Sequence, residues 1–146
     1  MPLLPDVRCK TSEYGVGKHR ILTEDKAMNE KPIRFDLDLI VDSFSDFCNS
    51  APGNETYGVI DCQGFFHADG LVRRSKCYGK LELRVFSEKK LRYTLFFDGE
   101  NGRHYKYVGE KVNISPWNLM ISFFTCYGTI YDSETLAHVS ESTVYL

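Results

Sequence analysis

Four tyrosines and the single tryptophan offer the most chemistry in this sequence, because each ring combines an apolar body with a polar group. Several such side chains on one face of a sheet can line a ligand cavity as well as fill a core. The predicted ligand-binding residues are Tyr57, Tyr93, Tyr105, Tyr107 and Trp117. A small barrel is normally filled by its own side chains, so core packing is the alternative role for these rings.

Two carboxylates are the next candidates. Asp36 and Asp38 lie two positions apart, which on a strand places both on one face, roughly 7 Å from each other. That separation would allow acid–base chemistry. The two residues alternate with Phe35, Leu37 and Leu39, however, so the solvated outer face of a half-buried strand explains them better.

The number and spacing of the cysteines argue against a disulfide framework and against a closed zinc site. The cysteines are Cys9, Cys48, Cys62, Cys77 and Cys126. They form an odd set without a CxxC pair, so we expect reduced thiols. The last three could form a nucleophilic pair in space with His67 or His104. A free cysteine on a strand is more often a small buried apolar residue.

The sequence contains no complete nucleotide-binding motif. Gly15-Val16-Gly17-Lys18 lacks the first glycine of a phosphate loop, and His19 stands where a magnesium-binding Ser or Thr would be. No GxGxxG fingerprint begins a dinucleotide fold. We therefore predict no catalytic residue, no metal and no cofactor.

The charge balance argues against general affinity for nucleic acids. The formal net charge is -2 and the pI is about 6.1, so the chain as a whole does not attract phosphates. The basic clusters 73–76 and 89–90 raise single-strand binding as an alternative, but most aromatic residues occupy the inward phase of their strands. No apolar run approaches the roughly 18 residues that would span a bilayer. Residues 1–10 do not resemble a secretory signal, so we expect a cytoplasmic protein.

The elements that position these residues are predicted from the alternation of apolar and polar side chains. Strands are expected over 34–41, 57–62, 78–86, 91–97 and 119–131, with others around 105–107 and 135–146. The glycines and asparagine of 98–102 predict a hairpin turn. A helical turn is expected over 43–47, with Phe44 and Phe47 pointing inward. Residues 119–131 are apolar on both faces, which indicates a strand covered on both sides.

Short strands joined by short turns, without a long helix, predict an all-β fold. We expect an antiparallel meander of about seven or eight strands that closes into a small barrel or sandwich. Residues 33–146 form the single β domain in this prediction. Residues 1–32 have no sustained period and are expected to be an extended N-terminal flank.

From residue 31 to about 132, the chain resembles a β-rich accessory segment of cholesterol-oxidase-like GMC flavoproteins. The similarity includes Phe35-Asp36-Leu37-Asp38-Leu39 and the segments 57–62, 91–97 and 105–112, followed by Pro116-Trp117. The resemblance implies a discrete β module associated with lipid or sterol metabolism. The chain lacks the flavin-binding parts of that family, so neither the oxidase activity nor any catalytic residue is carried over.

We therefore predict a non-catalytic β module that binds a protein partner or an apolar, lipid- or sterol-like ligand. The alternative is a small enzyme that uses Tyr, Asp or His side chains in a barrel cavity as acid or base. A cavity that brings titratable groups together beside apolar walls would favour the enzyme, whereas a filled core would count against it. The oligomeric state is left open.

Overall fold

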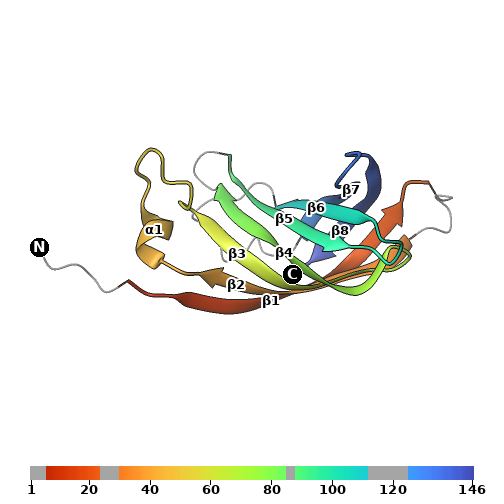
Figure 1. Cartoon of the computed structure of the whole chain (residues 1–146), viewed down its shortest axis with the longest axis horizontal. Helices are drawn as coiled ribbons and strands as arrows, with labels where there is room; N and C mark the ends of the chain where they lie inside the picture. The colour runs from red at the N-terminus through yellow and green to blue at the C-terminus, as the bar shows by residue number, and fades with distance from the viewer. Residues whose placement is uncertain (1–5, 24–29, 85–87, 112–124) are drawn as a thin grey trace, which may run out of the picture.

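The structure is a closed antiparallel β-barrel. It is a computed structural model that describes residues 6–23, 30–84, 88–111 and 125–146. Each strand pairs with the next along the chain, and β8 returns to β1 (Figure 1). The strands are β1 (Cys9–Ile21), β2 (Glu30–Val41), β3 (Val59–Ala68), β4 (Val72–Arg84), β5 (Lys90–Asp98), β6 (His104–Lys111), β7 (Thr125–Asp132) and β8 (His138–Tyr145). The predicted antiparallel meander is confirmed, and it closes as a barrel rather than a sandwich.

The first strand corrects the prediction that residues 1–32 are a flank outside the domain. β1 pairs with β2 on one side and with β8 on the other, so it closes the barrel. Its inward positions include Glu13, Gly15, Gly17 and His19, and this strand therefore lacks the apolar alternation by which other strands are recognised. Glycine is required where β1 approaches β8, because a Cβ on Gly17 would lie 1.9 Å from the Thr143 carbonyl oxygen.

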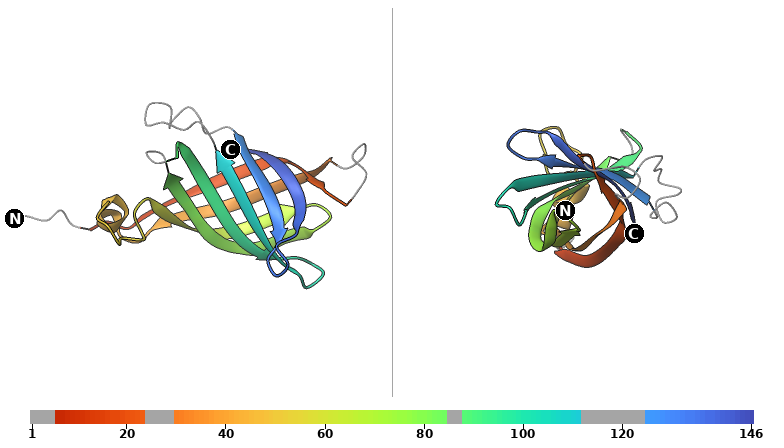
Figure 2. Two further views of the ribbon diagram at one scale, coloured as in Figure 1. Left: turned by 90° about the horizontal axis from the view of Figure 1, so that it is seen from above. Right: turned by 90° about the vertical axis from the view of Figure 1, so that its right-hand side faces the viewer.

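Two further predictions are corrected outside the core. The helical turn is confirmed as α1 (Phe44–Cys48), but Phe44 is 48% exposed, and its ring packs on Phe47, with 6.1 Å between the centroids. α1 lies beyond one end of the barrel (Figure 2), and neither Phe44 nor Phe47 belongs to the buried core cluster. β7 is covered only on its inner face, since Tyr127 is 58% exposed. Residues 119–124 of the predicted strand lie outside the described residues.

Aromatic rings fill the middle of the barrel. The rings of Phe66 and Phe97 are stacked with 4.2 Å between their centroids, and Phe35 lies 6.1 Å from Phe66. Tyr107 lies 5.3 Å from Phe66, above the cross-strand pair Gly109 and Gly128. A Cβ on either glycine would come within about 2.6 Å of the Tyr107 side chain, so these glycines make room for the ring. Removing one such ring would destabilise the fold by about 3 to 5 kcal/mol.

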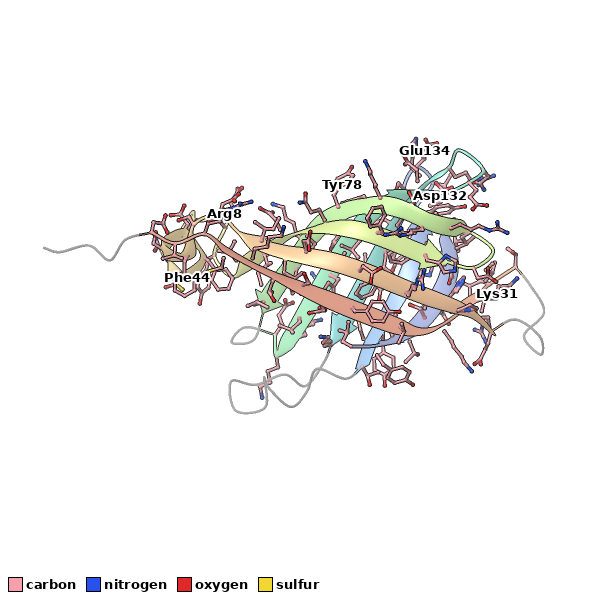
Figure 3. All side chains as sticks on the ribbon, turned by 90° about the horizontal axis from the view of Figure 1, so that it is seen from below. Arg8, Lys31, Phe44, Tyr78, Asp132 and Glu134 are labelled. Carbon is pink, nitrogen blue, oxygen red and sulfur yellow. The ribbon has the colours of Figure 1, made fainter. Side chains whose placement is uncertain are left out.

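The barrel has two structurally different ends, which we name after the inward side chains of β1. The Glu13 end lies beside α1, where Arg8 and Phe44 are found, and the His19 end lies beside Lys31 and Asp132 (Figure 3). Among the described residues, no helix is long and apolar enough to cross a membrane.

Candidate functional site

The structure brings together three of the five predicted ligand-binding residues. Tyr93, Tyr105 and Tyr107 are buried inside the barrel. Tyr57 is 45% exposed and lies in the connection between α1 and β3, away from these rings. Trp117 lies outside the described residues. The Tyr105 ring contacts Phe97 and the Tyr107 ring contacts Phe35 and Phe66, so much of the surface of these two tyrosines is used for core packing.

Tyr93 differs from the other two because its hydroxyl meets charged groups. Tyr93 Oη donates a hydrogen bond to the carboxylate of Glu13, which enters the barrel from β1. The ammonium group of Lys111, at the end of β6, lies 5.6 Å from the centroid of the Tyr93 ring. Glu13, Tyr93 and Lys111, from three strands, form what we call the interior polar cluster.

Burial changes the acid–base properties of this cluster. It lowers the pKa of the Lys111 ammonium, and the nearby Glu13 carboxylate opposes that change. Burial also raises the pKa of the Tyr93 hydroxyl, and the Glu13 charge and hydrogen bond raise it further. Tyr93 is therefore a hydrogen-bond donor at neutral pH, and the Lys111 side chain, which is 1% exposed, loses its proton more readily than a surface lysine.

Apolar side chains flank the interior polar cluster. Leu81 pairs with Tyr93 across β4 and β5, and Leu91 pairs with Lys111 across β5 and β6. Both leucines are buried. Cys62 and Cys126 also lie within electrostatic range of Tyr93. Hydrogen-bond donors and an acceptor therefore lie here among apolar side chains.

Glu13 lies on the first half of β1, which pairs with β2. In the described part of the chain, β1 pairs with β8 from Val16 to Ile21, whereas Cys9 to Gly15 pair only with β2. Glu13 belongs to this second stretch and is only partly buried.

The His19 end holds a second buried polar group. His19 Nε2 lies 2.9 Å from the carbonyl oxygen of Asp69, and Nδ1 lies 2.8 Å from Ser140 Oγ. Since a carbonyl only accepts, Nε2 carries the proton, and Nδ1 accepts from the Ser140 hydroxyl in the neutral ring. These neutral partners link β1, β8 and the turn between β3 and β4, which points to a structural role.

The other acid–base candidates lie on the outer face. Asp36 and Asp38 share the partly exposed outward phase of β2, and Asp38 lies 3.8 Å from Lys10 Nζ. They thus form the solvated face that the alternation predicts. His104 is likewise outward, with Nδ1 2.5 Å from an oxygen of Asp98.

The structure does not assemble the candidate nucleophilic pairs. The cysteines Cys62, Cys77 and Cys126 are buried, whereas His104 is exposed and His67 occupies the outward phase of β3. Burial raises the pKa of the Cys62 and Cys77 thiols to about 12 and that of Cys126 to about 11, so the thiols stay protonated at neutral pH. They pack as small apolar residues.

Sequence reasoning missed Glu13, His19 and Lys111. A signal for Lys111 was present, because Tyr105, Tyr107, Gly109 and Lys111 share one phase of β6. The glycines of β1 concealed the strand that carries the other two. Comparison with known proteins finds no matching family model, curated protein or solved structure. The resemblance to the GMC accessory segment stays a prediction.

Proposed function

We propose that this barrel is a binding module for a small apolar molecule that carries one polar group. The interior polar cluster of Glu13, Tyr93 and Lys111 supports this proposal, because it places a carboxylate, a hydroxyl and an ammonium group among apolar side chains. The polar group of the ligand would contact the cluster, and its apolar body would lie against Leu81 and Leu91.

Burying charged groups such as Glu13 and Lys111 costs free energy. A buried charged pair is commonly no more stabilising than apolar side chains of similar volume, because both groups lose their hydration. The rest of the barrel interior shows that aromatic and aliphatic side chains can fill this space. A charged cluster at one end is therefore explained better by recognition than by stability.

The filled middle of the barrel limits the size of the ligand. The stacked rings of Phe35, Phe66 and Phe97 occupy the centre, so the proposed site is confined to the Glu13 end. A compact apolar body suits this space better than a chain that runs the length of the barrel. The association with lipid or sterol metabolism and the cytoplasmic location remain predictions.

A thermal-shift screen tests the proposal, because a ligand that binds only the folded state raises the melting temperature. The probes are 3-phenylpropan-1-ol, 3-phenylpropanoic acid and 3-phenylpropylamine, together with a sterol and a fatty alcohol. We expect a rise with at least one probe that disappears in Lys111→Met. The matched control is Lys106→Met, an outward position of the same strand. Equal rises in both variants, or no rise with any probe, would contradict the proposal.

Protein binding is a second candidate, favoured by an exposed ridge on β1, β7 and β8. Its side chains are Tyr14, Val16, Tyr127 and Tyr145, all exposed. Val16 and Tyr145 are directly opposite each other across the β1–β8 ladder. A partner bound here would be lost in Tyr145→Ser and retained in Lys111→Met. The enzyme alternative is weaker, because the Asp and His residues predicted for it lie outside the interior polar cluster.

A further inference from the structure

The outer face of β4 carries basic and aromatic side chains that the proposed ligand site does not use. The basic cluster 73–76 lies near the start of this strand. The expectation that aromatic rings point inward does not hold beside it, because Phe65, Tyr78 and Phe96 occupy the outward phase of β3, β4 and β5. Tyr78 is 66% exposed, on the outside of the barrel (Figure 3). Cations and accessible rings therefore share one face.

A β-bulge brings Arg74 onto this face. Between its pairs with Phe66 and Ala68 of β3, β4 has two residues where β3 has one. Arg74 is one of these two, and its φ of 46° is a left-handed conformation that costs free energy in a residue with a Cβ. Its guanidinium lies 4.2 Å from the centroid of the Phe65 ring. A binding role would explain why an exposed arginine is held in an unfavourable backbone conformation.

Tyr78 lies at the centre of the face. Its ring stacks on that of Phe96, with 5.7 Å between the centroids. An open groove of about 470 Å³ lies beside the two rings, and its surface is mostly apolar. Lys76 lies two positions before Tyr78, so the two side chains leave the strand on the same side, roughly 7 Å apart. A planar group can therefore reach the rings with a cation next to it.

The carboxylates around this face leave two of its cations available. Three cation–carboxylate pairs border the face: Arg84 with Glu82, His104 with Asp98, and Arg73 with Glu100. Two further carboxylates, Asp36 and Asp61, lie on β2 and β3 rather than on β4. Among the described residues, neither Arg74 nor Lys76 forms an ion pair with a carboxylate. Both can therefore contact an anionic group of a ligand.

We infer that the outer face of β3, β4 and β5 binds single-stranded nucleic acid. Its side chains, which we call the basic aromatic face, are Phe65, Arg74, Lys76, Tyr78 and Phe96. Bases would stack on the exposed rings, and Arg74 and Lys76 would contact phosphates. A duplex suits this face less well, because its bases are stacked on one another and cannot reach Tyr78. The net charge of -2 gives no general attraction to phosphates, so binding depends on these local contacts.

Fluorescence anisotropy tests the inference. A labelled oligothymidylate of about twelve nucleotides, a length that single-strand-binding barrels accommodate, is titrated with the intact chain at physiological ionic strength. We expect saturable binding that Tyr78→Ser weakens at least about fivefold, the lower end of the effect of losing one base–ring stack. The matched control is Tyr127→Ser, which removes an outward ring of β7 that is 58% exposed. The control should bind like the native chain.

The salt dependence tests the cations separately. Lys76→Gln should reduce the slope of log affinity against log salt concentration by about 0.7, the effect of one lost phosphate contact on a single strand. Its control is Lys18→Gln, an outward lysine of β1 that is paired with Glu30. An unchanged slope in Lys76→Gln, or an equal change in both variants, would remove the proposed phosphate contact.

Three results would overturn the inference. The first is the absence of saturable binding to the single strand. The second is an equal affinity of Tyr78→Ser and Tyr127→Ser, since stacking at Tyr78 would then contribute nothing. The third is equally tight binding of a labelled polyglutamate peptide or of the matching duplex, which would show a general attraction to anions. Lys111→Met should bind the strand normally, because the interior polar cluster takes no part in this site.

Discussion

The two ends of the barrel bury polar side chains from the same strand in different ways. At the His19 end, the imidazole lies between Ser140 Oγ and the Asp69 carbonyl oxygen, both neutral partners. At the Glu13 end, a carboxylate lies beside a tyrosine hydroxyl and a buried ammonium group. In the described residues, His19 lies in the stretch of β1 that pairs with both β2 and β8, and Glu13 pairs with Leu37 of β2.

Under the proposed function, this difference separates a buried polar group with a structural role from one with a binding role. His19 joins elements that are far apart in the chain and lies where the barrel is closed. Glu13 lies where the polar groups carry charge. A neutral group with hydrogen-bond partners stabilises a fold, whereas burying charged groups costs hydration, which is the reason for the proposed binding role of the Glu13 end.

The largest expected effect is at the His19 end. His19→Ala leaves the Ser140 hydroxyl and the Asp69 carbonyl without their partner and removes a buried ring. We expect it to lower the free energy of unfolding by about 2 to 4 kcal/mol, measured by urea denaturation. Ligand binding at the Glu13 end should persist in the remaining folded protein. A cost below about 0.5 kcal/mol, as for an ordinary surface change, would remove the structural role.

Glu13→Gln should have the next largest effect on the free energy of unfolding. It removes the negative charge beside Lys111 and weakens the acceptor for Tyr93, and we expect a loss of about 1.5 to 2 kcal/mol, since bonds to charged groups are the stronger ones. Adding Lys111→Met should recover part of the loss, because no ammonium group then remains buried. Urea denaturation of the two single variants and the double variant gives the coupling. Additive losses would mean that Glu13 and Lys111 do not interact.

Tyr107→Phe should have a smaller effect on the free energy of unfolding. It provides the comparison with a tyrosine that has no charged neighbour, in the aromatic middle of the barrel. Tyr107 Oη lies 3.4 Å from Cys126 Sγ, a weak hydrogen bond, and the ring would keep its place over Gly109 and Gly128. We expect a loss of about 0.5 to 1.5 kcal/mol in urea denaturation, with ligand binding retained. A loss of binding would extend the ligand site into the middle of the barrel.

The smallest effect concerns an exposed histidine near the His19 end. The hydrogen bond and charge of Asp98 raise the pKa of His104 above the ordinary value of 6.5. The contact therefore stabilises the fold fully below that value and is lost as the pH rises through the raised folded-state pKa. The melting temperature of the native chain minus that of His104→Gln should be slightly positive near pH 5.5 and close to zero near pH 8.5. A difference independent of pH would exclude this charge effect.

The sequence predicts the strands best where buried and exposed side chains alternate along one strand. Leu91, Tyr93, Leu95 and Phe97 alternate with polar neighbours, and all four are buried in β5. The turn at 98–102 connects β5 to β6 as predicted, with Gly102 at a positive φ of 75°. β1 escaped prediction because its inward positions include glycines, which leave space for Phe35 and for the approach of β8.

The sequence also predicted only part of the candidate site. Tyr93 is recognisable in the sequence as an amphipathic ring on the inward phase of a strand, as are Tyr105 and Tyr107. Nothing in the residues around Tyr93 indicates that its hydroxyl meets Glu13, which is 80 positions away. The sequences around Tyr93 and Tyr107 therefore do not reveal that one ring belongs to a charged cluster and the other to a packed core.

Strand type and inner face follow from a local rule, since successive side chains on a strand point to opposite sides. The amino-acid order therefore specifies an antiparallel β fold and much of its apolar lining. Which side chains meet across the interior depends on strand order, on the stagger between strands and on the point where β1 leaves β8. Those are properties of the closed barrel, and they alone bring a carboxylate, a phenol and an amine from three distant strands into one site.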